Sequence, residues 1–161
     1  MIVKDSRGNE LLEMIDIAED EADKKYAPIN HALAVVKVGD DYIMGYNHWR
    51  KDWEIFGGCR EQNESIRACI IRECREELGI YREDYTYLGL MKYYMAPGYF
   101  NPDWHIEYGG LYGITLPGEA IEEIYRHRSD KREIERLEYY RNINKGEVIS
   151  EIDKRLLRYW D

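Results

Sequence analysis

The spacing of apolar side chains divides the chain into strands and helices. Residues 31–38 form a continuous apolar run, which is typical of a strand buried on both faces. An apolar start followed by a polar turn predicts an N-terminal hairpin over residues 2–16. Residues 18–25 are mostly charged and predict a solvated turn or a short helix. Shorter runs rich in aliphatic and aromatic residues predict further strands at 42–46, 53–56, 85–94, 105–116 and 134–141.

Helical spacing is clearest in one central segment, residues 64–78. Its apolar positions recur every four residues and form one stripe, made of Ile66, Ile70, Cys74 and Leu78. Gly79 follows directly and is a good helix stop. We expect two further helices, a short one at 118–126 and a terminal amphipathic one at 146–160.

The order of these elements is strands, helix, strands and helix. This order predicts an α/β (α+β) sandwich with a mixed β-sheet between helices. No repeat and no linker rich in Pro, Gly or Ser divides the chain, and 161 residues fit one domain of ordinary size. We therefore expect a single domain over residues 1–161, in which residues 1–30 form a hairpin and a turn that precede the core.

Composition and charge narrow the class of protein. Hydrophobic residues make up 44% and charged residues 34%, and no stretch approaches the ~18 apolar residues of a membrane span. The first ten residues lack the basic start and the apolar core of a signal peptide. The net charge is −9, whereas proteins that bind the nucleic-acid backbone are normally basic. We expect a cytoplasmic protein without a membrane or nucleic-acid partner.

The cysteines favour a cytoplasmic protein, and the tyrosines indicate strands. The three cysteines, Cys59, Cys69 and Cys74, are odd in number and match no zinc spacing, which favours a reducing compartment. Cys69 and Cys74 fall in the predicted helix and are interpreted as small packing residues. The 15 tyrosines are first of all a strand signal, with a ring-lined pocket that stacks on a base or a sugar as the alternative.

Candidate chemistry lies in residues 58–80, where acidic residues share one side of the predicted helix. Positions i, i+3 and i+4 of an α-helix lie on one face, so Glu73, Glu76 and Glu77 fall within one arc. Like charges at this spacing repel each other and weaken the helix. A divalent cation offsets that cost, because Mg²⁺ binds carboxylate and phosphate oxygens together.

Four neighbouring residues support the same interpretation. Glu64 lies near the helix start, where the helix dipole favours a carboxylate and from where it could also reach the metals. Arg72 is placed to pair with a carboxylate and to fix its orientation. Gly57 and Gly58 let the backbone pass close to a ligand or to the helix. A merely solvated acidic helix face, the common alternative, does not require these residues at fixed offsets.

This segment resembles the signature of the Nudix hydrolases. That signature consists of Gly, five residues, Glu, seven residues, Arg-Glu, two residues, Glu-Glu, one residue, Gly and an aliphatic residue. Cys74 stands where a larger aliphatic residue is usual, and Phe56 stands where proline is common in the lead-in. Every position of fixed type is satisfied, by Gly58, Glu64, Arg72, Glu73, Glu76, Glu77, Gly79 and Ile80.

The resemblance implies a fold, a reaction and a cofactor. The fold is a Nudix-type α/β/α sandwich with a mixed central β-sheet. The reaction is hydrolysis of the pyrophosphate bond in a nucleoside diphosphate linked to another group X, by attack of water on phosphorus. The implied cofactor is Mg²⁺ or Mn²⁺, and the implied partner is a small-molecule nucleotide diphosphate. MutT-like members are often homodimers, so a homodimer is a further expectation.

The resemblance also implies roles for particular residues. The expected metal ligands are Glu73, Glu76 and Glu77. The general base varies within the family, so we expect the catalytic carboxylates among Glu76, Glu77 and Glu133. Glu133 precedes a predicted strand and lies in the charge run 130–135, and Glu107 is a weaker rival. Orienting or structural roles are expected for Gly58, Glu64, Arg72 and Gly79.

Substrate contacts are expected from loops outside the signature. One loop precedes the glycine pair, and another, over residues 94–105, carries rings that could stack on a base. No feature of the sequence selects one nucleotide over another. The expected contacts are Gly57, His48, Tyr99, Trp104 and His105.

Three other functions compete with hydrolysis of a small nucleotide. A regulatory module could sense a nucleotide without hydrolysing it, but such modules often lose a helix glutamate. An RNA 5′-end pyrophosphohydrolase would use the same chemistry, although the acidic net charge disfavours it. An isopentenyl diphosphate isomerase shares the scaffold but needs a cysteine on a strand before the glycine pair, and none of the three cysteines precedes Gly57.

Overall fold

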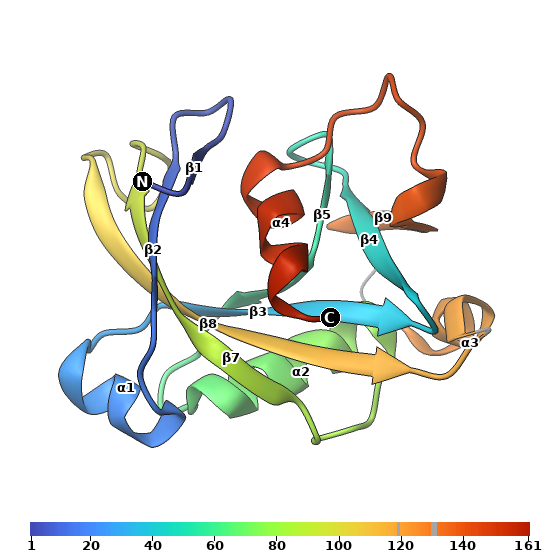
Figure 1. Cartoon of the computed structure of the whole chain (residues 1–161), viewed down its shortest axis with the longest axis horizontal. Coiled ribbons are helices and arrows are strands. Elements are labelled where there is room, and N and C mark those ends of the chain that lie inside the picture. The colour runs from blue at the N-terminus through green and yellow to red at the C-terminus, as the bar shows by residue number, and fades with distance from the viewer. Residues whose placement is uncertain (119, 130–131) are drawn as a thin grey trace.

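The computed structural model describes residues 1–118, 120–129 and 132–161. Within them, nine strands form one mixed sheet and four α-helices lie against it (Figure 1). The helices are α1 (Glu19–Lys25), α2 (Ile66–Leu78), α3 (Ala120–His127) and α4 (Glu151–Leu156). The strands are β1 (Val3–Lys4), β2 (Glu10–Ile15), β3 (His31–Val38), β4 (Asp41–Asn47), β5 (Asp52–Glu54), β6 (Phe56–Cys59), β7 (Thr86–Met95), β8 (His105–Leu116) and β9 (Ile134–Tyr139).

The sheet is organised around β3. It runs in the order β1-β2-β7-β8-β3-β4-β5, with β6 also paired to β3 and β9 paired to β4. β3 lies parallel to β8, whereas its first half pairs antiparallel with β6 and its last residues pair antiparallel with β4. This change of partner along one strand brings β6 onto the same side of β3 as β4 and directs its glycine pair toward α2.

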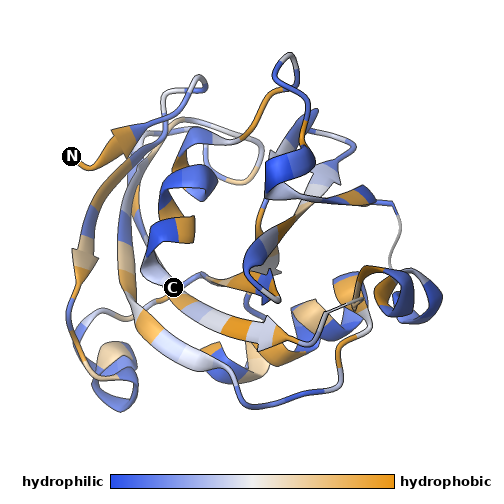
Figure 2. Cartoon of the chain, turned by 45° about the vertical axis from the view of Figure 1, so that its right-hand side comes forward, coloured by the Kyte–Doolittle hydropathy of each residue, from blue (hydrophilic) through white to orange (hydrophobic). Residues whose placement is uncertain are grey.

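Two apolar cores lie on opposite faces of the sheet, so the α/β/α sandwich expected from the sequence is confirmed. On one face, Ile70 of α2 packs with Phe56 and Tyr112, all of them fully buried. On the other face, Leu156 of α4 packs in a second cluster with Met91. Hydrophobic and hydrophilic residues alternate along the ribbons of α2 and α4, as one-sided burial requires (Figure 2). No helix among the described residues is long and apolar enough to cross a membrane.

α2 begins and ends where local chemistry dictates. Ser65 caps its start, since the hydroxyl oxygen accepts a hydrogen bond from the Ala68 amide at 3.0 Å. The helix therefore begins two residues later than predicted, and Glu64 lies just before it. Gly79 ends the helix in the left-handed region, with φ of 64°. A Cβ at Gly79 would stand 2.5 Å from the carbonyl carbon of His127, so only glycine fits there.

The strand predicted at residues 53–56 is wrong in its extent. The structure has two short strands here, because β5 pairs with β4 whereas β6 leaves that partner and pairs with β3. Gly57 and Gly58 lie inside β6 and do not end a strand. Gly57 adopts φ of 137°, and a Cβ there would collide with the carbonyl oxygen of Ala32, so close strand pairing requires glycine at this position.

The terminal helix is shorter than predicted. Residues 148–150 instead run beside β5, with the Trp53 amide donating to the Val148 carbonyl and the Ser150 amide donating to the Trp53 carbonyl, each at 2.9 Å. Ser150 then caps α4, which continues after Leu156 as a short 3-10 turn. Val148 is exposed and does not belong to the apolar stripe. The helix predicted over 118–126 is present as α3, although residue 119 lies outside the described residues.

Candidate active site

The glycine pair of β6 and the acidic side of α2 are in direct contact. The Gly57 amide donates a hydrogen bond to Glu77 Oε1 at 2.8 Å, and Glu77 is only 3% exposed. A Cβ added to Gly58 would stand 2.6 Å from Glu73 Oε1. Glu77 is therefore buried against the sheet, whereas the pattern of the helix alone places it on the polar side. Gly58 leaves the space that the Glu73 carboxylate occupies, and Gly57 binds Glu77 through its backbone amide.

Arg72 holds the carboxylates together. Its guanidinium donates from Nε and Nη2 to both oxygens of Glu64, at 2.7 and 3.1 Å. Nη1 donates to Glu73 at 3.0 Å and to Glu76 at 3.3 Å, and Nη2 also donates to the carbonyl oxygen of Cys59. The hydrogen bonds from Arg72 are the main reason that the pKa of Glu64 is lowered. The pairing of Arg72 with a carboxylate, expected from the sequence, is present.

Negative charge accumulates on this side of α2. Burial raises the pKa of the Glu73 carboxyl, Arg72 opposes this, and the charges of Glu76 and Glu133 raise the pKa further. Among the described residues, no three His, Cys, Asp or Glu side chains already converge as a metal site. The donor set nevertheless fits Mg²⁺ or Mn²⁺, because it consists of carboxylate oxygens only. The negative charge of Glu73 is only partly offset by Arg72, so a cation would be favourable there. Glu73, Glu76 and Glu77 are the residues that would hold the cation.

The structure brings Glu133 to the same place from a distant part of the chain. Its backbone carbonyl accepts a hydrogen bond from the His48 amide at 2.8 Å, and its charge acts on Glu73. The carboxylate of Glu133 accepts hydrogen bonds from Asn47 and Arg50, each at 3.3 Å. Residues 130 and 131 of the charge run that contains it lie outside the described residues.

Sequence reasoning missed three residues of this site. Asn47, Arg50 and Glu54 surround Glu133, and Asn47 and Glu54 are both buried. A signal was available for Glu54, which is a charged residue inside the otherwise apolar run from Trp53 to Phe56. Buried carboxylates need partners, so such a position predicts a nearby cation or amide.

The candidate substrate contacts other than Gly57 come from two separate parts of the chain, the turn after β4 and the loop between β7 and β8. His48 is half-exposed, with Nδ1 3.6 Å from Glu135. Trp104 packs on Tyr94, with ring centroids 5.1 Å apart, and His105 Nδ1 donates a hydrogen bond to the Asp103 carbonyl at 2.9 Å. Tyr99, at the tip of the same loop, is 95% exposed.

Glu107 lies beside His105, near the start of β8. It accepts a hydrogen bond from Asn30 at 3.0 Å and lies 3.7 Å from His105. Burial is the main reason that the pKa of the Cys59 thiol is raised, and the charges of Glu107 and Glu73 raise it further. Cys59 therefore lies within the electrostatic influence of both Glu107 and Glu73.

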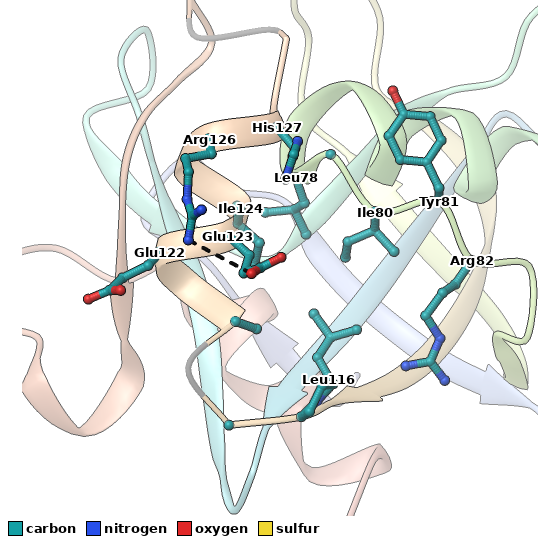
Figure 3. Close-up of a pocket in the computed structure, with 14 residues that line it drawn as sticks. Leu78, Ile80, Tyr81, Arg82, Leu116, Glu122, Glu123, Ile124, Arg126 and His127 are labelled. Atoms are coloured by element: carbon teal, nitrogen blue, oxygen red, sulfur yellow. Dashed lines mark ion pairs between the residues drawn. The ribbon is translucent and has the colours of Figure 1, made fainter.

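A cavity of about 390 Å³ lies elsewhere, between the end of α2 and α3 (Figure 3). Its wall includes Ile80, Leu116 and Ile124, and Glu123 and Arg126 form an ion pair at 3.8 Å along it (Figure 3). Among the described residues, none of the candidate carboxylates lines it. The cavity and the acidic site are therefore different places.

The sandwich fold and the acidic helix against a glycine pair define the class of this protein. The family model of the NUDIX domain matches residues 32–146, and the chain belongs to this family and is a Nudix hydrolase. Among curated relatives, it is similar to the mRNA-decapping protein g5R of African swine fever virus (isolate Pig/Kenya/KEN-50/1950), with 42% identity over 71 residues. That stretch is 44% of this chain and 27% of the relative, so the chain spans far less than two thirds of it.

Solved structures agree on the fold. The pyrophosphohydrolase BsRppH of Bacillus subtilis (E68A mutant) has a TM-score of 0.68 at 14% identity, over 98% of this chain and 93% of that chain. A MutT NUDIX hydrolase from Burkholderia pseudomallei has a TM-score of 0.59 at 16% identity, over 80% of this chain and 95% of that chain. At these identities the likeness concerns the fold alone.

Proposed function

We propose that this Nudix hydrolase cleaves a pyrophosphate bond at the 5′ end of RNA, in a reaction that depends on Mg²⁺ or Mn²⁺. The observation that carries the chemistry is the contact of Glu73 and Glu77 with Gly58 and Gly57. The similarity to an mRNA-decapping protein supports the RNA end as the substrate. A free nucleoside diphosphate linked to X is the second candidate, since it contains the same bond.

Different residues of the site would bind the cation and orient its ligands. When bound, the cation would offset charge on the phosphoryl oxygens and lower the pKa of a water molecule. Glu73, Glu76 and Glu77 would hold it, and Arg72 orients Glu73 and Glu76. Water oxygen forms a bond to one phosphorus, the bond to the bridging oxygen breaks, and the second phosphate leaves.

One proton leaves the attacking water, and a carboxylate accepts it. We propose Glu133 as the acceptor, with Glu76 and Glu77 as the alternatives within α2. The charge of Glu133 acts on Glu73, and Glu133 comes from the segment before β9 and not from α2, so it can reach the substrate independently of the helix. A positioned general base of this kind contributes about 10²- to 10⁴-fold to a rate.

An aromatic loop would contact the nucleotides that follow the 5′ end. Tyr99 and Phe100 are 95% and 94% exposed, although a turn braces the loop through the Gly98 amide, which donates to the Asn101 carbonyl at 2.8 Å. The Ala96 amide also donates to the side chain of Asn9 at 2.9 Å. Large exposed rings on a braced loop favour a binding role, because nothing in the described fold covers them.

The spacing of this loop from the glycine pair suits a chain of nucleotides. In the sheet, Gly109 lies opposite His31, which lies opposite Cys59. His105 is four residues from Gly109 along β8, roughly 13 Å at about 3.3 Å per residue, and Cys59 is two strand spacings from Gly109 across the sheet, about 10 Å. Several stacked bases, at about 3.4 Å each, cover these distances. Stacking of bases on aromatic rings is tolerant of sequence.

A substrate panel tests the proposal. It contains 5′-triphosphorylated RNA, cap-terminated RNA, ADP-ribose, dinucleotides and nucleoside triphosphates, each with and without Mg²⁺. We expect metal-dependent turnover with the highest kcat/KM on an RNA end. A higher kcat/KM on a free nucleotide would favour the second candidate. Binding of a nucleotide without any turnover would favour a sensor, which the intact set of Glu73, Glu76 and Glu77 argues against.

We further propose that residues 1–161 act as one unit. β2 pairs with β7 through five residue pairs, from Glu10 with Tyr94 to Ile15 with Leu90, so the N-terminal hairpin extends the central sheet. Limited proteolysis should therefore not release residues 1–30 from the folded protein. Early cleavage near residue 30 would contradict this proposal.

A further inference from the structure

Asn47, Arg50, Glu54 and Glu133 form one hydrogen-bonded network beside the carboxylates of α2. The network begins at the end of β4, where Asn47 is fully buried. Asn47 Oδ1 accepts hydrogen bonds from the amides of Trp49 and Arg50, at 3.0 and 2.9 Å. These bonds fix the turn between β4 and β5 and set the direction of the side-chain amide. The Nδ2 group then donates to Glu54 at 3.2 Å and to Glu133 at 3.3 Å.

Glu54 fixes the guanidinium of Arg50. It is 7% exposed, and its two oxygens accept from Nε and Nη2 of Arg50, so the planar fork is held in one orientation. From that orientation Nη2 also donates to Glu133 Oε1 at 3.3 Å. Glu54 is buried and ion-paired with Arg50. Movement of Arg50 away from Glu54 would leave a buried carboxylate without its cation, which is strongly unfavourable.

Both side-chain hydrogen bonds to Glu133 end on the same atom. Within the described residues, Asn47 and Arg50 both donate to Oε1. The backbone carbonyl of Glu133 is tied as well, through the His48 amide. Among the described residues neither Asn47 nor Arg50 donates to the second oxygen, Oε2, so this oxygen is available to accept a proton.

We propose that Asn47, Arg50 and Glu54 are positioning residues that hold Glu133 Oε1, so that Oε2 accepts the proton of the attacking water. This inference rests on the proposed function and on the role of Glu133 in it. The three residues act through Glu133 and do not touch the reacting atoms. Partners of this kind typically change activity by about 10- to 100-fold when they are replaced.

A double-mutant cycle tests the inference on the best substrate of the panel. Arg50→Lys keeps the charge but loses the fork, and Glu54→Gln releases the guanidinium. Each is measured in the natural background and in Glu133→Gln, with Arg126→Gln as a control at an exposed ion pair away from the site. We expect kcat to fall about 10-fold with KM unchanged in the natural background. In Glu133→Gln we expect no further fall.

Manganese affinity, read by the electron paramagnetic resonance of bound Mn²⁺, gives a second readout. A positioning role leaves it unchanged in Arg50→Lys, whereas general damage to the site weakens it. Equal losses of kcat in both backgrounds, or a loss of Mn²⁺ affinity, would overturn the inference while the proposed function stands. If the natural protein turns over no diphosphate substrate, or Glu77→Gln has full activity, the proposed function fails first.

Discussion

Gly58 lies directly against the carboxylate of Glu73. This carboxylate occupies the space that a side chain at position 58 would need. A Cβ at position 58 would stand 2.6 Å from Glu73 Oε1. The atom it meets is the end of a flexible side chain, so the carboxylate can move while the fold persists. The glycine of the signature is thus a device that sets where a glutamate lies.

Gly58→Ala should therefore separate activity from stability. We expect kcat/KM to fall by at least about ten-fold, since a small displacement of a proposed metal ligand has effects of this size or larger. The free energy of unfolding should fall by less than about 1 kcal/mol, because a side chain shifts and the backbone does not. Urea denaturation and steady-state kinetics measure both quantities. A variant with unchanged kinetics would contradict the account of this contact.

Gly57→Ala should behave in the opposite way. Gly57 has φ of 137°, and its Cβ would meet the backbone of Ala32, which belongs to the central strand and cannot yield. We expect a loss of several kcal/mol, of the order of 3 or more, and a protein that is largely unfolded or insoluble. Circular dichroism of the purified variant checks this. A folded Gly57→Ala protein with a near-normal Tm would show that β6 can leave β3.

Much of α2 could be predicted from its own sequence. The apolar stripe, the Ser65 cap and the stop at Gly79 are local signals, and the structure uses all of them. The terminal helix was predicted too long because its first residues look amphipathic but pair with β5. Periodicity within one segment does not report a backbone partner elsewhere in the chain.

The candidate site likewise contains contacts that the local sequence predicts and contacts that it does not. The pairing of Arg72 with a carboxylate could be expected from the sequence, and the structure shows that Glu64, eight residues earlier, is one of its partners. Arg50 and Glu133 are 83 residues apart, and they meet only because β9 pairs with β4. Nothing in the spacing of either residue reports that pairing. The split between β5 and β6 was likewise unpredictable, since it follows from β3 changing partners.

The raised pKa of Glu73 has a measurable consequence for stability. A carboxyl whose pKa is higher in the folded than in the unfolded protein contributes stability below the unfolded pKa, and that contribution is lost as pH rises through the folded pKa. Glu73→Gln has no charge to bury. It should therefore be more stable than the natural protein at pH 8, by up to about 1 kcal/mol, and this advantage should disappear near pH 4.

Thermal unfolding with and without Mg²⁺ completes this test. Mg²⁺ should raise the Tm of the natural protein, because a ligand that binds only the folded state stabilises it. In Glu73→Gln the shift should be lost, whereas Glu83→Gln, at an exposed position, should retain it. If Mg²⁺ raised the Tm of Glu73→Gln as much as that of the natural protein, Glu73 would not be a metal ligand.

Asp52 provides a second test of electrostatics, away from α2. Burial, followed by the neighbouring Glu54 carboxyl, raises the pKa of Asp52 to about 8. The natural protein should lose stability between about pH 4 and pH 8, since the unfolded chain gives up this proton earlier. Asp52→Asn should gain about 1–2 kcal/mol relative to the natural protein across that range. Asp84→Asn, at an exposed ion pair, is the matched control. Parallel pH profiles for Asp52→Asn and the natural protein would contradict the burial of a proton here.

The aromatic loop should matter for RNA and not for small nucleotides. Tyr99→Ala and Phe100→Ala should each raise KM for a 5′-triphosphorylated RNA by about ten-fold, because stacking of one base contributes about 1–3 kcal/mol. KM for a free nucleotide and the Tm should not change, since both rings are almost fully exposed. Tyr81→Ala, another exposed tyrosine, should leave all three values unchanged. A rise in KM for both substrates would place the loop on the nucleotide itself.

The most direct test of the central claim is release of phosphate or diphosphate from 5′-triphosphorylated RNA, or of the cap nucleotide from capped RNA, by the natural protein and by Glu77→Gln. Glutamine can still accept the hydrogen bond from the Gly57 amide, so the variant should fold. The account predicts release that requires Mg²⁺ or Mn²⁺ and that falls by at least about 100-fold in Glu77→Gln. Release that is independent of the metal, or equal in the two proteins, would contradict it.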